Sequence, residues 1–297
     1  SIKVDRCFKL RESKKVWVIG ANSFTGRYLV PALKKADYSV TETIVDITNA
    51  QQVEQLMLHI RPDYVINLAA ISFVPDAGSS EIYAINTFGP QNILDSCLQL
   101  ENTPKKIILA SSSHVYGEQS SEKIDESYFV NPVNHYGCSK WAMEQIAKTY
   151  TDKLNILITR PFNYTGKGQD EKFLIPKIVQ HFKQKSSNIE LGNIDIWRDF
   201  SDVRWIANAY VDLLTLKPEK GLTVLNLCSG SLNSIRDIIG MLQQLTGHQI
   251  HVDINQEFIR ETDMIKQSGC NYFLYHVLSN LAPPPDFKKT LSWMLTS

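Results

Sequence analysis

The sequence Val16-Trp17-Val18-Ile19-Gly20-Ala21-Asn22-Ser23-Phe24-Thr25-Gly26 has the pattern of a buried strand that turns sharply into a helix. Gly20 allows the chain to turn, and Gly26 allows the helix to pack closely on the strand. Such a turn directs free backbone N–H groups and the positive end of the helix toward one point, where a diphosphate can bind. The middle glycine of the usual GxxGxxG pattern is replaced by Ser23, whose hydroxyl can donate to a phosphate oxygen. The motif predicts a dinucleotide site, although two glycines in an ordinary tight turn give the same pattern.

Short apolar runs and helical patterns alternate through the first two-thirds of the chain. The apolar residues of the short runs are continuous rather than alternating, as expected when helices cover both faces of a parallel sheet. This alternation predicts an α/β fold with a doubly wound parallel sheet, and we assign residues 1–160 to a dinucleotide-binding domain. The predicted strands are Val16–Ile19, Tyr64–Leu68, Lys106–Ala110 and Ile156–Thr159, and the predicted helices are Gly26–Lys35, Gln51–Ile60, Ala84–Leu100 and Tyr136–Thr151.

The pattern becomes less regular after Arg160-Pro161. We expect residues 161–297 to form mainly a smaller α/β lobe that binds the substrate, with some segments returning to the main sheet. The predicted helices of this part are Lys172–Lys185, Val203–Thr215 and Ser234–Thr246, and a short last helix, Phe287–Met294, follows the prolines at 283–285.

The composition excludes several classes of protein. The 31 basic and 31 acidic residues cancel, so no overall field draws the chain to nucleic acid or to an anionic membrane. No apolar run reaches the roughly 18 residues of a membrane span, and Ser1–Lys15 lacks the apolar core of a signal peptide. The five cysteines are scattered without CxxC spacing, which argues against a disulfide framework or a metal site. We therefore expect a cytoplasmic protein that binds neither metal nor nucleic acid.

The region after the first predicted helix bears on the choice of dinucleotide. Residues Tyr38–Asp46 are expected to pass almost directly from a second strand into a third, which would shorten the loop facing the adenosine ribose. Glu42 is the only nearby carboxylate and can accept from the ribose hydroxyls, which would select NAD, but a solvated loop glutamate explains it equally well. This region contains no arginine that could bind the 2′-phosphate of NADP. The sequence leaves NAD and NADP both open.

Hydroxyl groups and a tyrosine–lysine pair supply the candidate chemistry. The predicted strand Lys106–Ala110 runs into Ser111-Ser112-Ser113-His114-Val115-Tyr116-Gly117, which places hydroxyls at the carboxyl edge of the sheet, where ligands bind in such folds. Tyr136 and Lys140, four residues apart, lie on one face of a predicted helix. An ammonium beside a phenol favours the phenolate and is expected to lower the pKa of Tyr136 toward neutrality. A serine hydroxyl can hold a substrate carbonyl within reach of that phenol.

The phosphate loop, the strand that ends in serines and the YxxxK pair together resemble the extended short-chain dehydrogenase/reductase family of sugar-nucleotide epimerases, dehydratases and reductases. The resemblance covers nearly the whole chain and implies a Rossmann fold with Ser112, Tyr136 and Lys140 as catalytic residues. Ser111 and Ser113 are expected mainly as caps of the strand end, and Tyr116 as a packed aromatic residue. The resemblance implies that NAD(P)H contacts Gly20, Asn22, Ser23, Phe24, Thr25, Gly26, Asp46, Ile47, Leu68, Ala69, Ala70, Asn86, Tyr136, Lys140 and Pro161.

Two segments of the second half resemble the members of the family that act on GDP-sugars. Residues 160–169 are similar to their RPFNHxGPGQ segment, with Lys167 in place of the proline, and residues 196–204 match VRDFTDVRD. The likeness implies a GDP-linked sugar as substrate, with fixed cations on its diphosphate, which arginine can bind bidentately. The alternatives are a salt bridge from Arg198 to Asp199 or Asp202, and a solvated helix lysine at Lys177. The implied substrate residues are Ser72, Ser112, Ser113, His114, Asn163, Phe173, Lys177, Arg198, Arg260 and Asp263.

His114 bears on the reaction type. Dehydratases of the family resembled here carry a glutamate at this place that removes a proton beside the ketone, and that glutamate is absent. Epimerising reductases carry a cysteine there, and histidine can perform such chemistry. The histidine that works with that cysteine has no match, because the aligned stretch reads Gly166-Lys167-Gly168. His114 is therefore expected to hydrogen-bond the substrate or to be a packed residue.

The resemblance implies reduction of the C4 ketone of a GDP-4-keto-6-deoxy sugar by NAD(P)H. In this hypothesis Tyr136 donates a proton to the ketone oxygen, Lys140 lowers the pKa of the phenol and holds the nicotinamide ribose, and Ser112 orients the carbonyl. The alternatives are a 4-epimerase, a combined epimerase/reductase, a 4,6-dehydratase and a non-catalytic dinucleotide sensor. The intact serine, tyrosine and lysine argue against the sensor.

Two helices carry more apolar residues than one buried face requires. In the helix that spans Asn86–Leu100, Phe88 and Leu100 are not obviously covered by the sheet, and in Tyr136–Thr151 the apolar residues Trp141, Met143, Ile146 and Ala147 spread around the axis. Relatives that the chain resembles pair these helices across a two-fold axis. The sequence thus predicts a symmetric homodimer, and the alternative is that these residues pack under the substrate lobe of the same chain.

Overall fold

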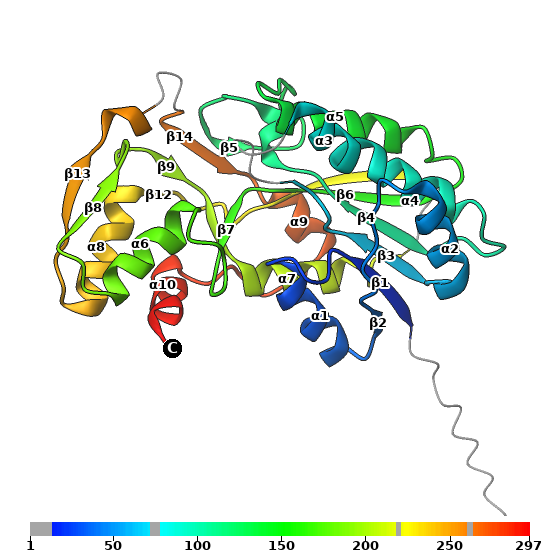
Figure 1. The fold of residues 1–297 in the computed structure, drawn as a ribbon, viewed down its shortest axis with the longest axis horizontal. Helices are drawn as coiled ribbons and strands as arrows, with labels where there is room; N and C mark the ends of the chain where they lie inside the picture. The colour runs from blue at the N-terminus through cyan, green and yellow to red at the C-terminus, as the bar shows by residue number, and fades with distance from the viewer. Residues whose placement is uncertain (1–13, 72–77, 218–220, 260–263) are drawn as a thin grey trace, which may run out of the picture.

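A six-stranded parallel sheet forms the centre of the molecule (Figure 1). The computed structural model describes residues 14–71, 78–217, 221–259 and 264–297. The strands of this sheet are β1 (Lys15–Ile19), β2 (Ser39–Thr41), β3 (Tyr64–Asn67), β4 (Lys106–Ala110), β6 (Asn155–Pro161) and β11 (Gly221–Leu227). Their order is β11-β6-β4-β3-β1-β2, and every neighbouring pair is parallel. The order reverses between β1 and β3, and such a reversal leaves a ligand crevice at the carboxyl ends of the strands.

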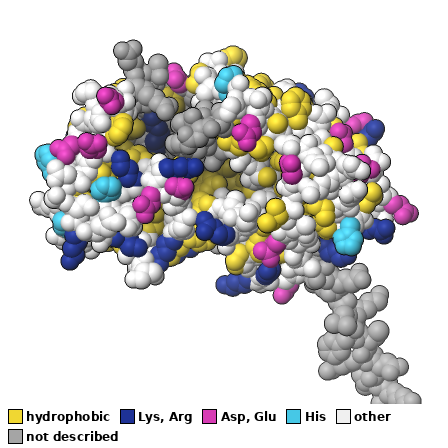
Figure 2. Space-filling view, in the orientation of Figure 1, with side chains coloured by type: hydrophobic (Ala, Val, Ile, Leu, Met, Phe, Trp, Pro, Cys, Tyr) yellow, Lys and Arg dark blue, Asp and Glu magenta, His cyan; other side chains and the backbone are white. Residues whose placement is uncertain are grey.

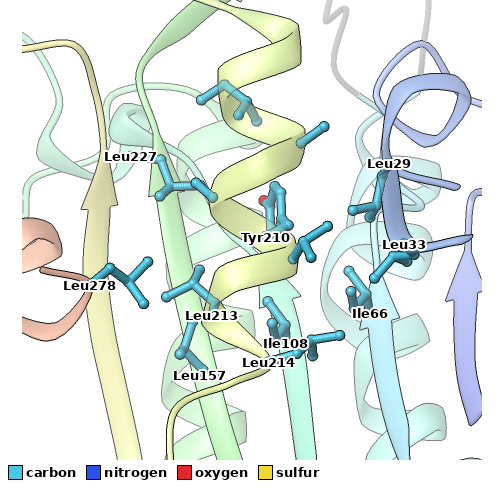
Figure 3. Close-up of a cluster of buried hydrophobic side chains, with 14 of the residues drawn as sticks. Leu29, Leu33, Ile66, Ile108, Leu157, Tyr210, Leu213, Leu214, Leu227 and Leu278 are labelled. Atoms are coloured by element: carbon cyan, nitrogen blue, oxygen red, sulfur yellow. The ribbon is translucent and has the colours of Figure 1, made fainter. Parts of the chain in front are cut away.

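Helices cover both faces of the sheet, which explains why β1, β3 and β4 carry buried residues on both sides. One face carries α1 (Gly26–Lys35), α7 (Val203–Leu213) and α9 (Tyr272–Val277), and the other carries α2 (Ala50–Ile60), α4 (Gly89–Cys97) and α5 (His135–Lys148). In β1, Val16 and Val18 face the first core while Trp17 and Ile19 face the second. Figure 3 shows the first core, where Tyr210 of α7 lies among strand and helix side chains. The predicted doubly wound parallel sheet is confirmed.

The helix predicted over Ala84–Leu100 is wrong in its bounds and in its form. It begins earlier, with α3 (Ser79–Tyr83), continues as a π-helical turn, η1 (Ala84–Phe88), and ends with α4 at Cys97. Pro90 has no amide proton to return to the carbonyl of Asn86, and the amide of Gly89 bonds back to Ala84 instead. The wide turn therefore lies directly before the proline that begins α4.

The short passage from a second into a third strand, predicted within Tyr38–Asp46, is also wrong. Only β2 forms there, and the described residues 42–49 contain no strand. The side chain of Ile44 is 77% exposed, and the carboxylate of Asp46 accepts from the backbone amide and hydroxyl of Thr48 at 3.0 and 2.6 Å. This local turn leads directly into α2.

A smaller lobe lies beside the carboxyl edge of the main sheet (Figure 1). Its core is formed by α6 (Leu174–Lys183), α8 (Ile235–Thr246) and α10 (Phe287–Leu295), packed with the parallel pair β8 (Asn188–Leu191) and β13 (His251–Ile254). Two further small sheets join the lobe to the main sheet. They have the orders β12-β9-β14-β5 and β10-β7, built from β5 (Ser121–Ile124), β7 (Asn163–Thr165), β9 (Trp197–Arg198), β10 (Phe200–Asp202), β12 (Asn233–Ser234) and β14 (Lys266–Gly269).

The chain crosses between the two parts more than once. Strand β11 and helix α7, which follow residue 161, belong to the main sheet and its core, while β5, which precedes it, pairs with β14. Among the described residues, none of the helices combines the length and apolarity of a membrane span. The same residues hold no group of three or more His, Cys, Asp or Glu side chains arranged for a metal ion.

A buried ion pair fastens α5 to the sheet. The guanidinium of Arg160, at the end of β6, lies 2.6 Å from the carboxylate of Glu144, and the two side chains are only 5% and 2% exposed. A second bond, from Arg160 Nε to Glu144 Oε1 at 3.0 Å, makes the contact bidentate. Burying both charges is tolerated because each satisfies the other.

We expect Arg160→Met to lower the free energy of unfolding by about 3–5 kcal/mol, because Glu144 would remain buried without its counter-charge. Urea unfolding followed by circular dichroism measures the change. Arg236→Met is the matched control, because Arg236 pairs with Asp195 at 2.8 Å on the open surface, and solvent screens such pairs. Equal effects of the two substitutions would contradict the role of burial.

Candidate active site

The phosphate loop has the close backbone approaches that its glycines predict. Gly20 has a φ of +83°, and a Cβ there would lie 2.9 Å from the backbone nitrogen of Ala69 at the end of β3. A Cβ on Gly26 would lie 2.4 Å from the carbonyl oxygens of Gly20 and Ala21. Ser23 Oγ accepts from the amide of Gly26 at 3.1 Å, so its own proton is left to donate. The loop therefore offers N–H and O–H donors at the start of α1, as a diphosphate requires.

The segment after β3 is held by buried amide side chains. Asn67 Oδ1 accepts from the backbone amide of Ala69 at 3.1 Å. Asn86, which is fully buried, bonds both the amide and the carbonyl of Ile71, at 2.9 and 3.2 Å, and donates to Ser139 Oγ at 3.2 Å. Asn86 thus ties the segment after β3 to α5.

A cavity of about 610 Å³ opens between the carboxyl edge of the main sheet and the lobe. Figure 2 shows the hollowed face, with hydrophobic side chains in the hollow and Lys and Arg side chains beside it. The predicted residues that line the cavity are Ser23, Phe24, Thr25, Leu68, Ala70, Ser112, Ser113, His114, Tyr136, Lys140, Pro161, Asn163 and Phe173. The cavity brings together residues of both halves of the chain.

Other predicted residues lie away from the wall of this cavity. Asp46 closes the turn on Thr48, and Ile47 is buried against Gly89. Lys177 Nζ donates to the carbonyl of Glu190 at 2.8 Å and lies over the Phe258 ring. Ser72, Arg260 and Asp263 lie outside the described residues.

Arg198 lies on β9 and is not among the residues that line the cavity. Its Nη1 donates to the carbonyl of Trp197 at 2.8 Å, and its charge is close enough to His114 to help lower the pKa of that imidazole. Asp199 and Asp202, which the sequence suggested as salt-bridge partners of Arg198, accept hydrogen bonds from other groups. Asp199 accepts from the amides and hydroxyl of residues 229–230, and Asp202 pairs with Arg204 at 2.7 Å.

Ser112, Tyr136 and Lys140 meet at the end of β4. Ser112 has an extended backbone and begins the 3₁₀ turn η2 (Ser113–Tyr116). Tyr136 lies in the first turn of α5, whose N-terminus is capped by Asn134 Oδ1 accepting from the amide of Gly137 at 2.8 Å. Lys140 Nζ donates to the carbonyl of Ala110 at 2.8 Å and lies 5.9 Å from the centre of the Tyr136 ring. The predicted trio therefore shares one site.

Burial shifts the pKa values of Tyr136 and Lys140. It raises the pKa of Tyr136 to about 12, and the hydrogen bond with Ser112 acts in the opposite direction. Burial lowers the pKa of Lys140 to about 8, and the negative charge of Glu144 opposes that shift. The pKa of Tyr136 is therefore not lowered toward neutrality as expected, because desolvation by burial is the largest influence on it. At neutral pH the phenol keeps its proton and the lysine keeps its charge.

Glu144 is a residue that the sequence reasoning missed. It accepts from Ser111 Oγ at 2.5 Å as well as from Arg160, and Arg160 Nη1 in turn donates to the hydroxyl of Tyr116 at 3.1 Å. The hydroxyl of Tyr116 donates to Asn226 Oδ1 on β11 at 2.7 Å. Glu144 follows Lys140 by four residues, so the spacing of the YxxxK pair continues for one more turn on the buried face. That spacing was the available signal.

The segment 163–169 contacts the phosphate loop and α1 directly. The hydroxyls of Tyr164 and Thr25 lie 2.6 Å apart, Arg27 Nη2 donates to the carbonyl of Gly168 at 2.8 Å, and the hydroxyl of Tyr28 donates to the carbonyl of Lys167 at 2.6 Å. The phosphate loop and the segment 163–169, which resembles those of GDP-sugar enzymes, thus form one continuous wall.

A dinucleotide loop facing a serine–tyrosine–lysine set defines a short-chain dehydrogenase/reductase site. The sequence profile of the NAD dependent epimerase/dehydratase family matches residues 16–228, and the chain belongs to this family. This confirms the resemblance to the extended short-chain dehydrogenases/reductases.

Relatives match the chain over nearly its whole length. It is 34% identical over 271 residues to GDP-6-deoxy-D-talose 4-dehydrogenase of Aggregatibacter actinomycetemcomitans, which covers 90% of this chain and 92% of the relative. It is 30% identical over 299 residues to GDP-6-deoxy-D-mannose reductase of Pseudomonas aeruginosa, covering 96% and 97%. The structure of RMD from Pseudomonas aeruginosa complexed with NADPH has a TM-score of 0.86 at 27% identity, over 95% of this chain and 96% of that chain.

We expect Gly26→Ala to raise the dissociation constant for NADH or NADPH at least about tenfold, roughly 1.4 kcal/mol, because the new Cβ would meet backbone oxygens 2.4 Å away. Titration of cofactor fluorescence measures it. Gly240→Ala is the control, because a Cβ on this helical glycine meets nothing within 4 Å. Unchanged affinity in Gly26→Ala would contradict the close approach.

Proposed function

We propose that the chain reduces the C4 ketone of a GDP-linked 4-keto-6-deoxy sugar with a reduced nicotinamide dinucleotide. The observation that carries the proposal is that Ser112, Tyr136 and Lys140 line the same cavity as Asn163 and Phe173 of the lobe. The two relatives named above are, by name, a dehydrogenase and a reductase of GDP-6-deoxy sugars.

The residues present fit a nicotinamide dinucleotide. Gly20 and Gly26 leave the backbone open where side chains would clash, and Ser23 and Thr25 line the cavity beside them. The region after β2 carries Glu42, whose carboxylate is paired with Lys34 at 2.9 Å on the surface. This pairing leaves NADH and NADPH both as candidates, and each is to be used in the assays.

The residues of the site perform the proton chemistry. When bound, the reduced nicotinamide supplies the hydride that adds to C4 of the sugar. Tyr136, which burial keeps protonated, gives its phenol proton to the ketone oxygen, so that the ketone becomes an alcohol and the phenol a phenolate. Lys140, held by the carbonyl of Ala110, stabilises that phenolate by its charge. Ser112 holds the ketone oxygen beside Tyr136.

The sharpest test of this function follows reduced nicotinamide absorbance during reaction with GDP-4-keto-6-deoxy-mannose. We expect stoichiometric loss of NADH or NADPH, and we expect Tyr136→Phe to lower turnover by roughly 10²–10⁴-fold, the usual effect of removing a positioned acid, without loss of cofactor binding. No turnover of any keto sugar nucleotide would overturn the reductase assignment. Sugar interconversion without net cofactor consumption would identify a 4-epimerase, and solvent deuterium at C3 or C5 a combined epimerase/reductase.

We further propose that Arg198 contributes charge to the nucleotide-sugar diphosphate. Its guanidinium lies close enough to His114, on the cavity wall, to lower the pKa of that imidazole. Lys177, together with Arg260 and Asp263 outside the described residues, remains a further proposed contact of the nucleotide.

Replacing Arg198 by Ala should raise the dissociation constant for GDP by about one to two decades, because a charge-assisted contact contributes about 1.5–3 kcal/mol. Calorimetric titration with GDP, and separately with NADPH, measures both affinities. Arg236→Ala, on the surface of α8, serves as the control. If Arg198→Ala weakens both ligands equally, the arginine supports the fold rather than the nucleotide.

We propose a homodimer that pairs α4 and α5 with their two-fold copies. Phe88, next to α4, is 53% exposed, and exposed aromatic side chains are enriched in interfaces. The apolar surface is smaller than the sequence suggested, because Leu100, Met143 and Ala147 pack in the core of the main sheet.

The free thiols of Cys97, Cys138, Cys228 and Cys270 support a cytoplasmic location.

Light scattering at micromolar concentration tests the assembly. We expect a mass near twice the 33.8 kDa of one chain, and Phe88→Glu should shift it toward one chain by placing charges in the paired surface. Glu substituted for the equally exposed Phe258 of the lobe should leave the dimer intact. A wild-type mass near 33.8 kDa would exclude the dimer.

A further inference from the structure

Arg27 follows the phosphate loop directly and lies in the first turn of α1. Its side chain lines the same cavity as Ser23, Phe24 and Thr25 of that loop. In an α-helix the Cα–Cβ bonds tilt toward the N-terminus, so a long side chain in the first turn can reach the point where the loop amides converge. Arg27 therefore lies close to the place where a diphosphate binds.

The segment 163–169 holds the guanidinium of Arg27. Nη2 donates to the carbonyl of Gly168 at 2.8 Å. A Cβ on Gly168, whose φ is +84°, would lie 3.7 Å from both Nη1 and Nη2, so the guanidinium packs closely on this residue. The hydroxyl of Tyr28 bonds the carbonyl of Lys167 at 2.6 Å beside it. These contacts fix the head group of Arg27 between α1 and the segment 163–169.

One hydrogen bond leaves most donors of this guanidinium available. Arginine carries five N–H donors in a rigid fork. Among the residues that the structure describes, none accepts from Nη1 or Nε of Arg27, and no carboxylate oxygen lies within 4.0 Å of it. The carboxylate of Asp170, which also lines the cavity, lies 4.0 Å from Lys172 Nζ instead. The positive charge of Arg27 thus has no partner of opposite charge in the described cavity wall.

A diphosphate is the partner that these donors fit. Each phosphate of a dinucleotide carries a negative charge, whereas the start of a helix offers only about half an elementary charge. The loop over residues 20–26 contains neither lysine nor arginine, so Arg27 is the first cation after it. Guanidinium groups bind phosphate oxygens through short, charge-assisted hydrogen bonds. Arg27 therefore supplies the full charge that the loop lacks.

We propose that Arg27 binds the diphosphate of the nicotinamide dinucleotide with the donors that Gly168 does not use. The inference deepens the proposed function and rests on it for the nature of the ligand, but it does not depend on which keto sugar is reduced. The same guanidinium then contacts the cofactor and the segment that carries Asn163. A bound dinucleotide consequently fastens that segment to the phosphate loop.

Two substitutions separate the charge of Arg27 from its hydrogen bond. Arg27→Gln keeps an N–H donor without the charge, and Arg27→Lys keeps the charge. We expect Arg27→Gln to raise the dissociation constants for NADH and NADPH alike by about tenfold to one-hundredfold, the effect of a charge-assisted contact. Arg27→Lys should stay within about fivefold of wild type, because the ammonium still attracts phosphate. Cofactor fluorescence titration without any sugar nucleotide measures these constants.

Arg61→Gln is the matched control. Arg61 also donates to a backbone carbonyl, that of Leu58 at 3.2 Å, but it lies at the end of α2 and is not among the residues that line the cavity. Its substitution should leave both dissociation constants unchanged. Circular dichroism and thermal unfolding verify that each variant is folded.

Salt dependence gives a second readout, which a purely structural contact with Gly168 would not change. Arg27 is exposed, so dissolved ions screen its attraction for a phosphate. The dissociation constant of wild type should therefore rise with ionic strength more steeply than that of Arg27→Gln. Arg27→Lys should keep the steeper slope of wild type.

Several results would overturn the inference. If Arg27→Gln binds both dinucleotides as wild type does, or if Gln and Lys lose equal affinity, the guanidinium only holds Gly168. A loss confined to NADPH would place the contact on the 2′-phosphate, and a loss confined to GDP, titrated separately, would place it on the nucleotide sugar. Because the titrations contain no keto sugar, a failure to reduce any such sugar would reject the proposed reaction alone.

Discussion

The ion pair between Glu144 and Arg160 is the interaction on which the geometry of the site depends. Removing two charges from water is costly unless every polar atom has a partner. The carboxylate of Glu144 accepts from the Arg160 guanidinium and from Ser111. The guanidinium also donates to the hydroxyl of Tyr116, which in turn donates to Asn226. The network joins α5 to the ends of β4, β6 and β11. A shift of α5 would break several of these bonds at once, so the helix that presents Tyr136 and Lys140 has few tolerated positions.

A second link joins the two ligand-binding parts of the cavity. The segment 163–169 touches the phosphate loop and α1 through Tyr164, Lys167 and Gly168. Lys167 stands where the similar GDP-sugar segment has proline, yet the contact with Tyr28 uses the backbone carbonyl, which a proline also has. The additional side chain extends over the Trp293 ring of α10. The replacement is therefore compatible with the wall of the cavity, and the lysine side chain adds a contact with α10.

The parts that the sequence predicted well are those that local rules control. The bounds of α1 are as predicted, because Gly26 and the apolar repeat that follows it depend only on near neighbours. Ser112 follows the carboxyl end of β4, and Tyr136 and Lys140 reach the same cavity from one face of α5, as their four-residue spacing predicts. The errors concern the helix over residues 84–100, the pKa of Tyr136 and the role of Glu144. A π turn interrupts the predicted helix just before Pro90, and desolvation by burial, which depends on the tertiary fold, raises the pKa of Tyr136. In the sequence, nothing distinguishes Glu144 from the other polar residues of its helix, because its partners Arg160 and Ser111 are distant along the chain.

The pairing of β6 with β11 has a consequence for synthesis on the ribosome. The two strands pair in register from Asn155–Gly221 to Pro161–Leu227, although much of the lobe lies between them in the sequence. The apolar edge of β6 therefore emerges long before its partner, and at about 5–20 residues per second it waits several seconds for β11. An uncovered apolar edge strand is a template for association with other chains. Nascent chains of this protein should consequently need a holding chaperone more than their modest size suggests.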